Sequence, residues 1–231
     1  MVTAFLGSDM LFGSKFRSAL LMVSLLAIVA GCDSGVKEKV AGEEMDGKKV
    51  EQSDAPAAGG FDVAVAEGGA LTFNAPDSWK KVKPRSFVVE YEITVPKSAG
   101  EADDAEDGRL TIMGAGGSVE ANVERWYGQY SQPDGGQTKD VAKVTETSVG
   151  DCKVTWVDIT GTLLDRPGGP MAGGEVVERE NYRTMGAIIQ AGEVGQYFVK
   201  LYGPGKTISD NEEAFKAFVE SLKVNQEAKG M

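Results

Sequence analysis

The sequence predicts an α+β fold in which an antiparallel β-sheet is flanked by two main α-helices. Three observations lead to this prediction. From about residue 60 onward, short runs alternate apolar and polar residues, as half-buried strands require. Segments 118–130 and 210–222 instead carry apolar residues at helical spacing. The strand-like runs follow one another directly, with one helix between them and one after them, which favours antiparallel pairing.

The strands are predicted from this alternation. Segments 61–66 and 70–75 should form a hairpin around Glu67-Gly68-Gly69. Segment 86–95 places Tyr91 on an apolar face and Glu92 on a polar one, so it should have one buried side and one side in water. The remaining strands are expected at 109–114, 141–149, 152–164, 184–191 and 196–203.

The first helix, at 118–130, has Val123 and Trp126 on one apolar stripe, so Trp126 is expected to pack in the core. The glycine-rich turn at 114–117 is expected to adopt positive φ and lead the strand into this helix. Ser118 is the expected N-cap, since its hydroxyl can accept a bond from the first turn.

The second helix, at 210–222, is expected to bury Phe215 on its apolar stripe. Asp210 and Glu213 have the spacing of a capping box at its start. Gly203-Pro204 should end the strand before it, because proline cannot continue the ladder of hydrogen bonds.

The first part of the chain predicts export and lipid attachment. Lys15 and Arg17 precede an apolar run at 19–30, which suits a signal peptide and is too short to span a bilayer. The run ends in four residues that resemble a bacterial lipobox. Cleavage between Gly31 and Cys32 would leave a thiol for diacylglycerol transfer, and two acyl chains give stable anchoring. These four residues are Val29-Ala30-Gly31-Cys32.

Four parts are expected along the chain. They are a signal peptide at 1–31, a disordered tether at 32–60, an α+β domain at 61–225 and a C-terminal tail at 226–231. The tether is rich in small and charged residues and has no aromatic residue, so it cannot bury enough surface to fold. Translation from Met1 and from Met10 both remain open.

The expected location is the cell envelope, with the domain anchored on the extracytoplasmic side of a membrane, periplasmic or at the outer surface. Asp33 resembles an inner-membrane retention signal of some double-membraned bacteria, and inner and outer membrane both stay open. If Cys32 is acylated, Cys152 has no disulfide partner. Cys152 lies in a strand-like run and is expected to be a buried small hydrophobic residue.

Charge and composition argue against several function classes. The net charge of −11 disfavours nucleic acid and anionic lipid headgroups as partners, since both attract clusters of Lys and Arg. The sequence contains no histidine, which removes the commonest general base and the commonest metal ligand.

Two local motifs are expected not to bind ligands. After Gly114 the chain lacks the lysine of a P-loop, and Val119 occupies the last position of a dinucleotide fingerprint. Glu120 would repel an anion at the helix N-terminus. The acidic loop at 101–108 lacks two ligand positions of an EF-hand and is expected to be a solvated hairpin tip. No nucleotide, metal or other cofactor is expected.

Three short motifs carry a family resemblance. FNAPDSW at 73–79, NVERWYGQY at 122–130 and YFVKLYGP at 197–204, before a helix ending in FVESL, resemble the PsbP-like fold over roughly 61–225. This resemblance implies an α/β/α sandwich. The fold is shared by an extrinsic photosystem II subunit, a Ran-binding nuclear import factor and bacterial secreted or lipid-anchored proteins. Its members imply a binding or assembly role without a catalytic centre.

The predicted function is therefore that of a lipid-anchored envelope protein that binds or assembles a protein partner without catalysis. An enzyme of unrecognised type without histidine and a structural envelope component remain alternatives. The candidate partner-binding residues are Asn122 and Arg125, which lie off the centre of the helical stripe, and Arg179 and Arg183, which flank Tyr182.

Overall fold

A computed structural model describes residues 59–167 and 175–225. The chain divides into two units, Met1–Gln52 and Ser53–Met231, and the described residues belong to the second. The predicted signal peptide, the lipobox, the C-terminal tail and nearly all of the tether lie outside the described residues. Within the described ranges, no helix combines the length and apolarity needed to cross a bilayer.

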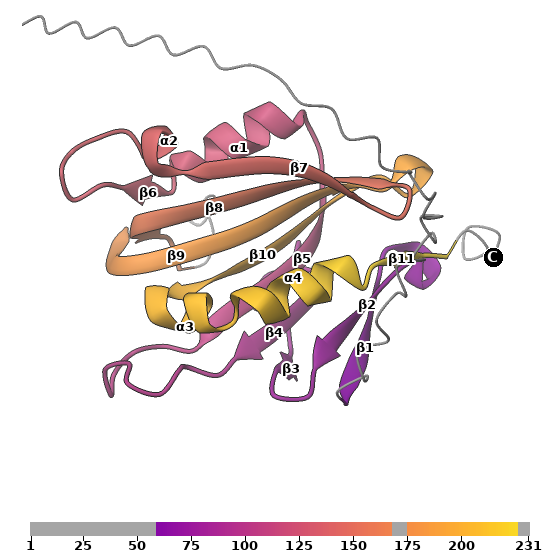
Figure 1. The fold of residues 1–231 in the computed structure, drawn as a ribbon, viewed down its shortest axis with the longest axis horizontal. Helices are drawn as coiled ribbons and strands as arrows, with labels where there is room; N and C mark the ends of the chain where they lie inside the picture. The colour runs from indigo at the N-terminus through magenta and orange to yellow at the C-terminus, as the bar shows by residue number, and fades with distance from the viewer. Residues whose placement is uncertain (1–58, 168–174, 226–231) are drawn as a thin grey trace, which may run out of the picture. The chain divides into compact units, whose positions relative to one another are not determined.

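The described part is an α+β domain built on two antiparallel sheets (Figure 1). The 8-stranded sheet has the order β3-β4-β5-β10-β9-β8-β6, and β7 also pairs with β8. The 3-stranded sheet has the order β1-β2-β11. The large sheet comprises β3 (Lys80–Val82), β4 (Tyr91–Val95), β5 (Gly108–Ala115), β6 (Tyr130–Ser131), β7 (Lys143–Val149), β8 (Cys152–Asp165), β9 (Val177–Gln190) and β10 (Gln196–Pro204). The small sheet comprises β1 (Gly60–Val65), β2 (Leu71–Pro76) and β11 (Lys223–Val224).

The helices are short. They are α1 (Val119–Tyr127), α2 (Thr138–Val141), α3 (Gly205–Asp210) and α4 (Glu212–Glu220), with 3-10 turns η1 (Glu67–Gly69) and η2 (Gly192–Val194). Helices α3 and α4 follow each other almost without a break, because only Asn211 separates them.

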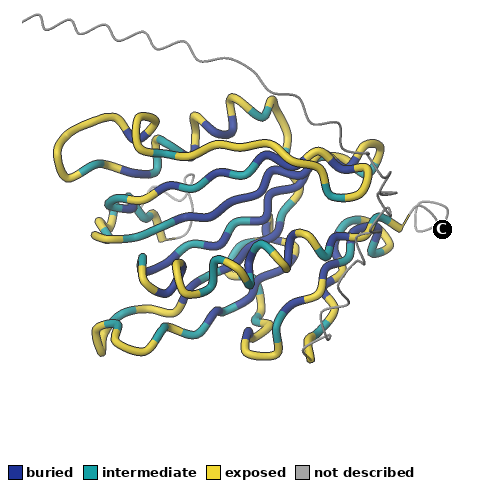
Figure 2. The backbone as a smooth tube through the Cα atoms, viewed as in Figure 1, coloured by how far each residue is buried: buried dark blue, intermediate teal, exposed yellow. Residues whose placement is uncertain are grey.

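Alternation along β10 divides the interior into two hydrophobic cores. Val199 and Leu201 point into a core that α4 closes with Phe215 and also contains the apolar residues of β1 and β2. Phe198 points the other way, into a smaller core that α1 closes with Trp126. Figure 2 shows the result, with buried positions concentrated along the central strands and exposed positions in the loops and on the outer helix faces.

Several expectations are confirmed. The hairpin at 61–75 exists, with Val65 opposite Leu71 and η1 between them. Ser118 is the N-cap of α1, and its hydroxyl accepts a hydrogen bond from the amide of Ala121 at 3.2 Å. Of the glycines that precede it, Gly117 has a positive φ of 83°, whereas the expectation of positive φ is wrong for Gly114 and Gly116.

The prediction for segment 86–95 is wrong in two respects. The strand covers only Tyr91–Val95, because residues 86–89 form a turn, in which the amide of Val89 donates to the carbonyl of Ser86 at 3.2 Å, instead of following β5. Phe87 is consequently fully exposed, at 101%. Glu92 is only 1% exposed rather than in water, because arginine side chains neutralise it.

The helix boundaries also differ from the prediction. The first helix ends at Tyr127, and Tyr130 belongs to β6, since Gly128 follows the helix and lets the chain reverse. The capping box is wrong: Asp210 ends α3 and bonds to Lys206 within it, at 2.5 Å. The N-cap of α4 is Asn211, whose side chain makes no capping hydrogen bond.

Candidate binding site

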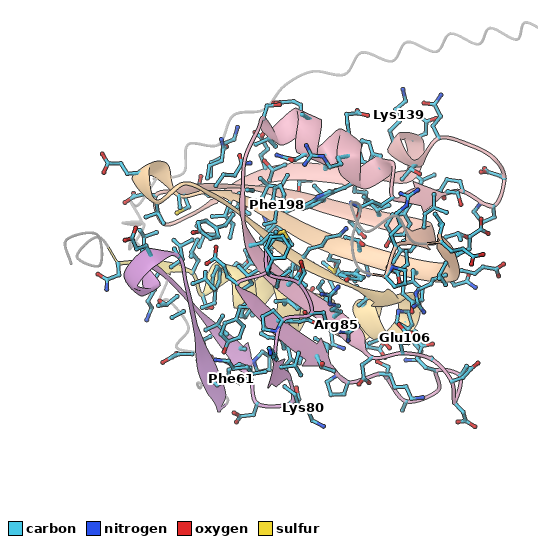
Figure 3. All side chains as sticks on the ribbon, turned by 180° about the vertical axis from the view of Figure 1, so that it is seen from behind. Phe61, Lys80, Arg85, Glu106, Lys139 and Phe198 are labelled. Atoms are coloured by element: carbon cyan, nitrogen blue, oxygen red, sulfur yellow. The ribbon has the colours of Figure 1, made fainter. Side chains whose placement is uncertain are left out.

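A charged and aromatic cluster lies on the sheet face that carries α1. We call it the Lys200 cluster; it consists of Arg109, Trp126, Gln129, Lys200 and Tyr202. Lys200 and Tyr202 occur on β10 on the same side as Phe198, since successive strand residues alternate between faces. Figure 3 views the molecule from this side, with Phe198 labelled near the middle of the sheet and α1 above it.

The ammonium of Lys200 is surrounded by neutral groups. Its Nζ donates to Oε1 of Gln129 and lies 5.4 Å from the ring centre of Trp126 and 5.5 Å from that of Tyr202. Among residues 59–167 and 175–225, no carboxylate forms an ion pair with Lys200. Burial, and secondarily the positive charge of Arg109, lower the pKa of Lys200 to about 8.

The neighbouring arginine, Arg109, already has a carboxylate partner. Arg109 binds both carboxylate oxygens of Glu92 at 2.8 Å and also donates to the hydroxyl of Tyr202. Arg85 completes this network with an Nε–Oε1 distance of 3.1 Å to Glu92. Burial by itself would raise the pKa of Glu92, but hydrogen bonds from Arg109 and the Arg85 amide keep it below its ordinary value. Within the described residues, Lys200 is therefore the cation of this group that has no carboxylate partner.

Packing fixes the aromatic side of the cluster. Trp126 contacts Phe198 edge to face, with ring centres 5.1 Å apart. Its ring also lies directly against Gly186, where an added Cβ would come within 2.3 Å of Cζ3. Tyr130 and Thr184 share a buried hydrogen bond of 2.7 Å beneath the same helix. The expectation that Trp126 packs in the core is confirmed, since it is 3% exposed.

The two candidate residues on α1 have different surroundings. Asn122 is fully buried, and its Nδ2 donates to the carbonyls of Gly116 and Ser118 at 3.0 and 2.9 Å. Its Oδ1 accepts from Nη1 of Arg125 at 2.7 Å. Asn122 thus holds the turn before α1 and offers no atom to a partner, whereas Arg125 is exposed.

Arg179 and Arg183 lie on opposite faces of the large sheet. Arg179 pairs with Asp165 and Glu106, each at 2.9 Å, on the face of α1. Arg183 points to the face of α3 and α4, where it binds Asp158 with two bonds of 2.8 Å and Glu212 at 2.7 Å. The structure therefore does not bring these two arginines together as one binding surface.

A surface groove of about 790 Å³ is lined by Tyr182 and Arg183, together with residues of β8, α3 and the 132–133 turn. It forms where the pairing of β8 with β9 shifts register between Gly161 and Leu163, because β9 has one extra residue there. Across the bulge, Asn181 has a positive φ of 55°, which is uncommon outside glycine. The Arg183 side chain in this groove already forms ion pairs with Asp158 and Glu212.

A second groove, of about 430 Å³, lies near the start of β8 and includes Cys152 among its lining residues. Cys152 is 3% exposed, which confirms the expectation of a buried small hydrophobic residue. Burial raises the pKa of its thiol, as does the charge of Asp151, so the neutral form is favoured.

Hydrogen bonds from Lys97 stabilise the acidic loop at 101–108. The Lys97 ammonium donates to the carbonyls of Ala102 and Asp103 at 3.1 and 2.6 Å, and its amide donates to Asp107 at 2.9 Å. Within the residues that the structure describes, no three potential metal-ligating side chains converge.

Comparisons with known proteins give structural likenesses only. No family model and no curated protein sequence matches the chain. Cyanobacterial PsbP from Synechocystis sp. PCC 6803 aligns with a TM-score of 0.43 and 10% identity, covering 74% of this chain and 96% of that one. The Ran-binding protein Mog1p of Saccharomyces cerevisiae aligns at 0.40 and 10% identity, covering 73% and 96%.

LpqN of Mycobacterium tuberculosis, described as involved in cell envelope biogenesis, aligns with a TM-score of 0.37 and 8% identity, covering 72% of this chain and 85% of that one. One of these neighbours is a PsbP protein, the family that the sequence resembles. At these scores the likenesses assign neither a family nor a function to the chain.

The Lys200 cluster was not predicted from the sequence. The expected apolar face of the last strand contains Tyr197, Val199 and Leu201, and these residues are indeed buried. The sequence does contain a signal for the opposite face of this strand. Every second residue is aromatic, cationic and then aromatic: Phe198, Lys200 and Tyr202. Arg109 lies opposite Tyr202 in β5, a pairing that needs the strand register.

Proposed function

We propose that this protein is exported, anchored to a membrane through a lipid on Cys32, and acts in the cell envelope as a non-catalytic binding or assembly factor for a protein partner. Support for the anchor comes from the signal-like segment and the lipobox-like residues 29–32. Support for binding comes from the Lys200 cluster, whose cation has no carboxylate partner in the described part of the chain.

The chemistry of the Lys200 cluster suits a carboxylate of the partner. An ammonium between aromatic rings has two donors left after the bond to Gln129. Burial removes solvation from the Lys200 ammonium. Coulomb attraction to a docked carboxylate would offset that desolvation cost. Arg109 would add positive potential without giving up Glu92, because two bonds of 2.8 Å hold it to that carboxylate. An acidic side chain or a C-terminal carboxylate of a protein fits this site.

The anchor is tested by replacing Cys32 with Ser and following membrane fractionation in cells. The variant is expected to leave the membrane fraction, while the parent chain stays there after high-salt washing. Retention of Cys32→Ser in the membrane fraction would show that the lipobox interpretation is wrong.

The binding site is tested by in-cell crosslinking from a photoreactive residue at Gln129. The proposal expects a specific protein adduct that Lys200→Gln reduces at least tenfold, whereas Lys139→Gln on exposed α2 leaves it unchanged. An adduct of equal yield in both variants would contradict a role for Lys200. This result is independent of the anchor, since the lipidated parent is used throughout.

The lowered pKa of Lys200 favours one second candidate, an enzyme in which the neutral amine attacks a carbonyl substrate. Amine catalysis also requires an enclosed site, and the two grooves described above are lined by other residues. Treatment with simple aldehydes and ketones followed by borohydride would distinguish an enzyme that uses this amine from a non-catalytic binding protein. Selective reductive labelling of Lys200 supports the enzyme, and labelling spread over the exposed lysines supports the binding protein.

A further inference from the structure

Residues 78–89 depart from the acidic character of the chain. The segment reads SWKKVKPRSFVV, so it contains Lys80, Lys81, Lys83 and Arg85 and no acidic residue, in a protein of net charge −11. The structure places these residues on edge strand β3 and on the loop that leads to β4. In the described ranges, neither Lys80 nor Lys83 makes an ion pair, and Arg85 shares Glu92 with Arg109.

The same loop exposes two large apolar side chains. Phe87 is 101% exposed and Val88 is 53% exposed, so Phe87 makes no protective contact with the described domain. Lysines on an edge strand also prevent edge-to-edge pairing of sheets. That role does not account for an aromatic side chain held in water beyond the end of the strand, next to four cationic residues.

The loop lies at the end of the domain where the chain from the proposed anchor arrives. Gly60 is opposite Pro76 in the β1–β2 pair, and the amide of Asp77 donates to the carbonyl of Gly59 at 3.4 Å. Lys80 follows only a few residues later. Figure 3 labels Phe61 and Lys80 near each other at one end of the molecule. The tether from a lipid at Cys32 would therefore join the domain at this end.

We infer that residues 80–88 dock the domain onto an anionic bilayer surface, with Phe87 and Val88 entering the interface and Lys80, Lys83 and Arg85 contacting lipid headgroups. Basic residues near an anionic leaflet and aromatic residues at the headgroup level both favour this position. The net negative charge of the chain keeps other faces away from the same surface. The inference goes beyond the proposed function, and only its orientation argument rests on the anchor.

The test uses residues 53–231, which contain both hydrophobic cores and lack the predicted signal and Cys32. Binding is measured by sedimentation with vesicles of phosphatidylcholine alone or with 30% phosphatidylglycerol, about as anionic as a bacterial membrane surface. We expect binding to the mixed vesicles only, weakened by 0.5 M salt because salt screens the headgroup charge. Absence of binding to the mixed vesicles would overturn the inference.

Two paired variants and a matched control locate the contact. Phe87→Ser with Val88→Ser and Lys80→Gln with Lys83→Gln should each lower the partition coefficient about tenfold or more. The control, Lys139→Gln with Val141→Ser, removes one exposed lysine and one exposed valine from α2 and should leave binding unchanged. Equal binding by all three variants, each with the thermal midpoint of the parent, would also overturn the inference.

Insertion of the loop is measured with an environment-sensitive dye on Val88→Cys. Selective labelling is possible because Cys152, the other thiol of this chain segment, is buried. Emission should shift to the blue with phosphatidylglycerol vesicles and stay constant with phosphatidylcholine alone. A photocrosslinker at Phe87 that reacts in cells with an acidic protein, while the dye shows no shift, would assign the loop to a protein partner instead.

Discussion

At the residue scale, the charge of Lys200 works against folding. Burial lowers the pKa of this lysine from 10.5 to about 8, so its protonated form is less favourable in the folded chain than in the unfolded one. A binding protein tolerates such a cost where the charge is needed for a partner. The cost is therefore evidence that Lys200 is retained for a purpose other than stability.

Replacing Lys200 with Met is expected to raise the free energy of unfolding at pH 7 by about 1–2 kcal/mol, roughly half of what the pKa shift corresponds to, since the residue keeps some contact with solvent. Below pH 8 the lysine is protonated in both states, so the cost is fully present. Between about pH 8 and 10.5 only the unfolded state keeps the proton, and the parent gains stability. Urea unfolding of the parent and the Lys200→Met variant at pH 7 and pH 10 measures the difference in their free energies of unfolding. A difference that is as large at pH 10 as at pH 7 would contradict the prediction.

Gly186 is a second residue with a specific role, because Trp126 occupies the space of its missing side chain. Gly186→Ala should lower the free energy of unfolding by about 1–3 kcal/mol, since the indole must move within a packed core. Gly116→Ala is the matched control, as an added Cβ there meets nothing within 4 Å. Chemical denaturation with Trp fluorescence measures both variants, and similar losses in both would show that the contact is not the cause.

At the element scale, helix α1 depends on the turn that precedes it. Asn122 donates to the carbonyls of Gly116 and Ser118 from inside the helix, so Asn122→Ala removes both bonds and the packing of a fully buried side chain. We expect a loss of about 1–3 kcal/mol for this variant and less than about 0.5 kcal/mol for Glu124→Ala, which is exposed on the same helix. Thermal unfolding compares the two, and equal stability of both variants would refute the structural role of Asn122.

The elements that the sequence predicts well are those whose pattern is local. The hairpin around Glu67-Gly68-Gly69 and the Ser118 cap depend on turn and cap residues within a few positions, and both are present. Segment 86–95 has an equally clear alternation, yet half of it is a loop. Alternation gives the preference of a segment, but a strand must also pair with a neighbour, and residues 86–89 turn away from β5, which continues to Ala115.

The candidate site is harder to predict for the same reason. Glu92 alternates as a solvent-facing residue and is buried only because Arg109, seventeen positions later in the chain, reaches it. Lys200 and Trp126 meet because a helix returns across the sheet. Arg179 and Arg183 look like neighbours in sequence, and the bulge at Asn181 helps to place them on opposite faces. Such relations are tertiary, so local patterns do not contain them.

At the scale of the whole molecule, net charge conceals how charge is distributed. The value of −11 predicts that the chain as a whole avoids anionic surfaces. The four basic residues at 80–85 form a local exception at the end where β1 begins. A tethered domain with one cationic end would be oriented, and the Lys200 cluster on the large sheet would then present a fixed direction to its partner.

The two ends of the described chain close one small sheet, which makes the domain depend on its last strand. β11 pairs with β2, and the amide of Asn225 donates to the carbonyl of Ala70 at 2.8 Å (Figure 1). Leu222, just before β11, is 8% exposed and belongs to the larger core. Strand pairing and core packing therefore both link the C-terminal segment to the N-terminal hairpin.

A chain of residues 53–221 should consequently be less stable than one of residues 53–225 by about 2–4 kcal/mol, from the burial of Leu222 and the lost strand contacts. Urea unfolding followed by far-ultraviolet circular dichroism measures the difference. Lys223→Gln in the longer chain is the control, since this side chain is exposed and its backbone still pairs with β2, so its midpoint should be unchanged. Equal midpoints for the two chain lengths would mean that the hairpin is held by α4 alone, through contacts such as Phe73 with Phe218.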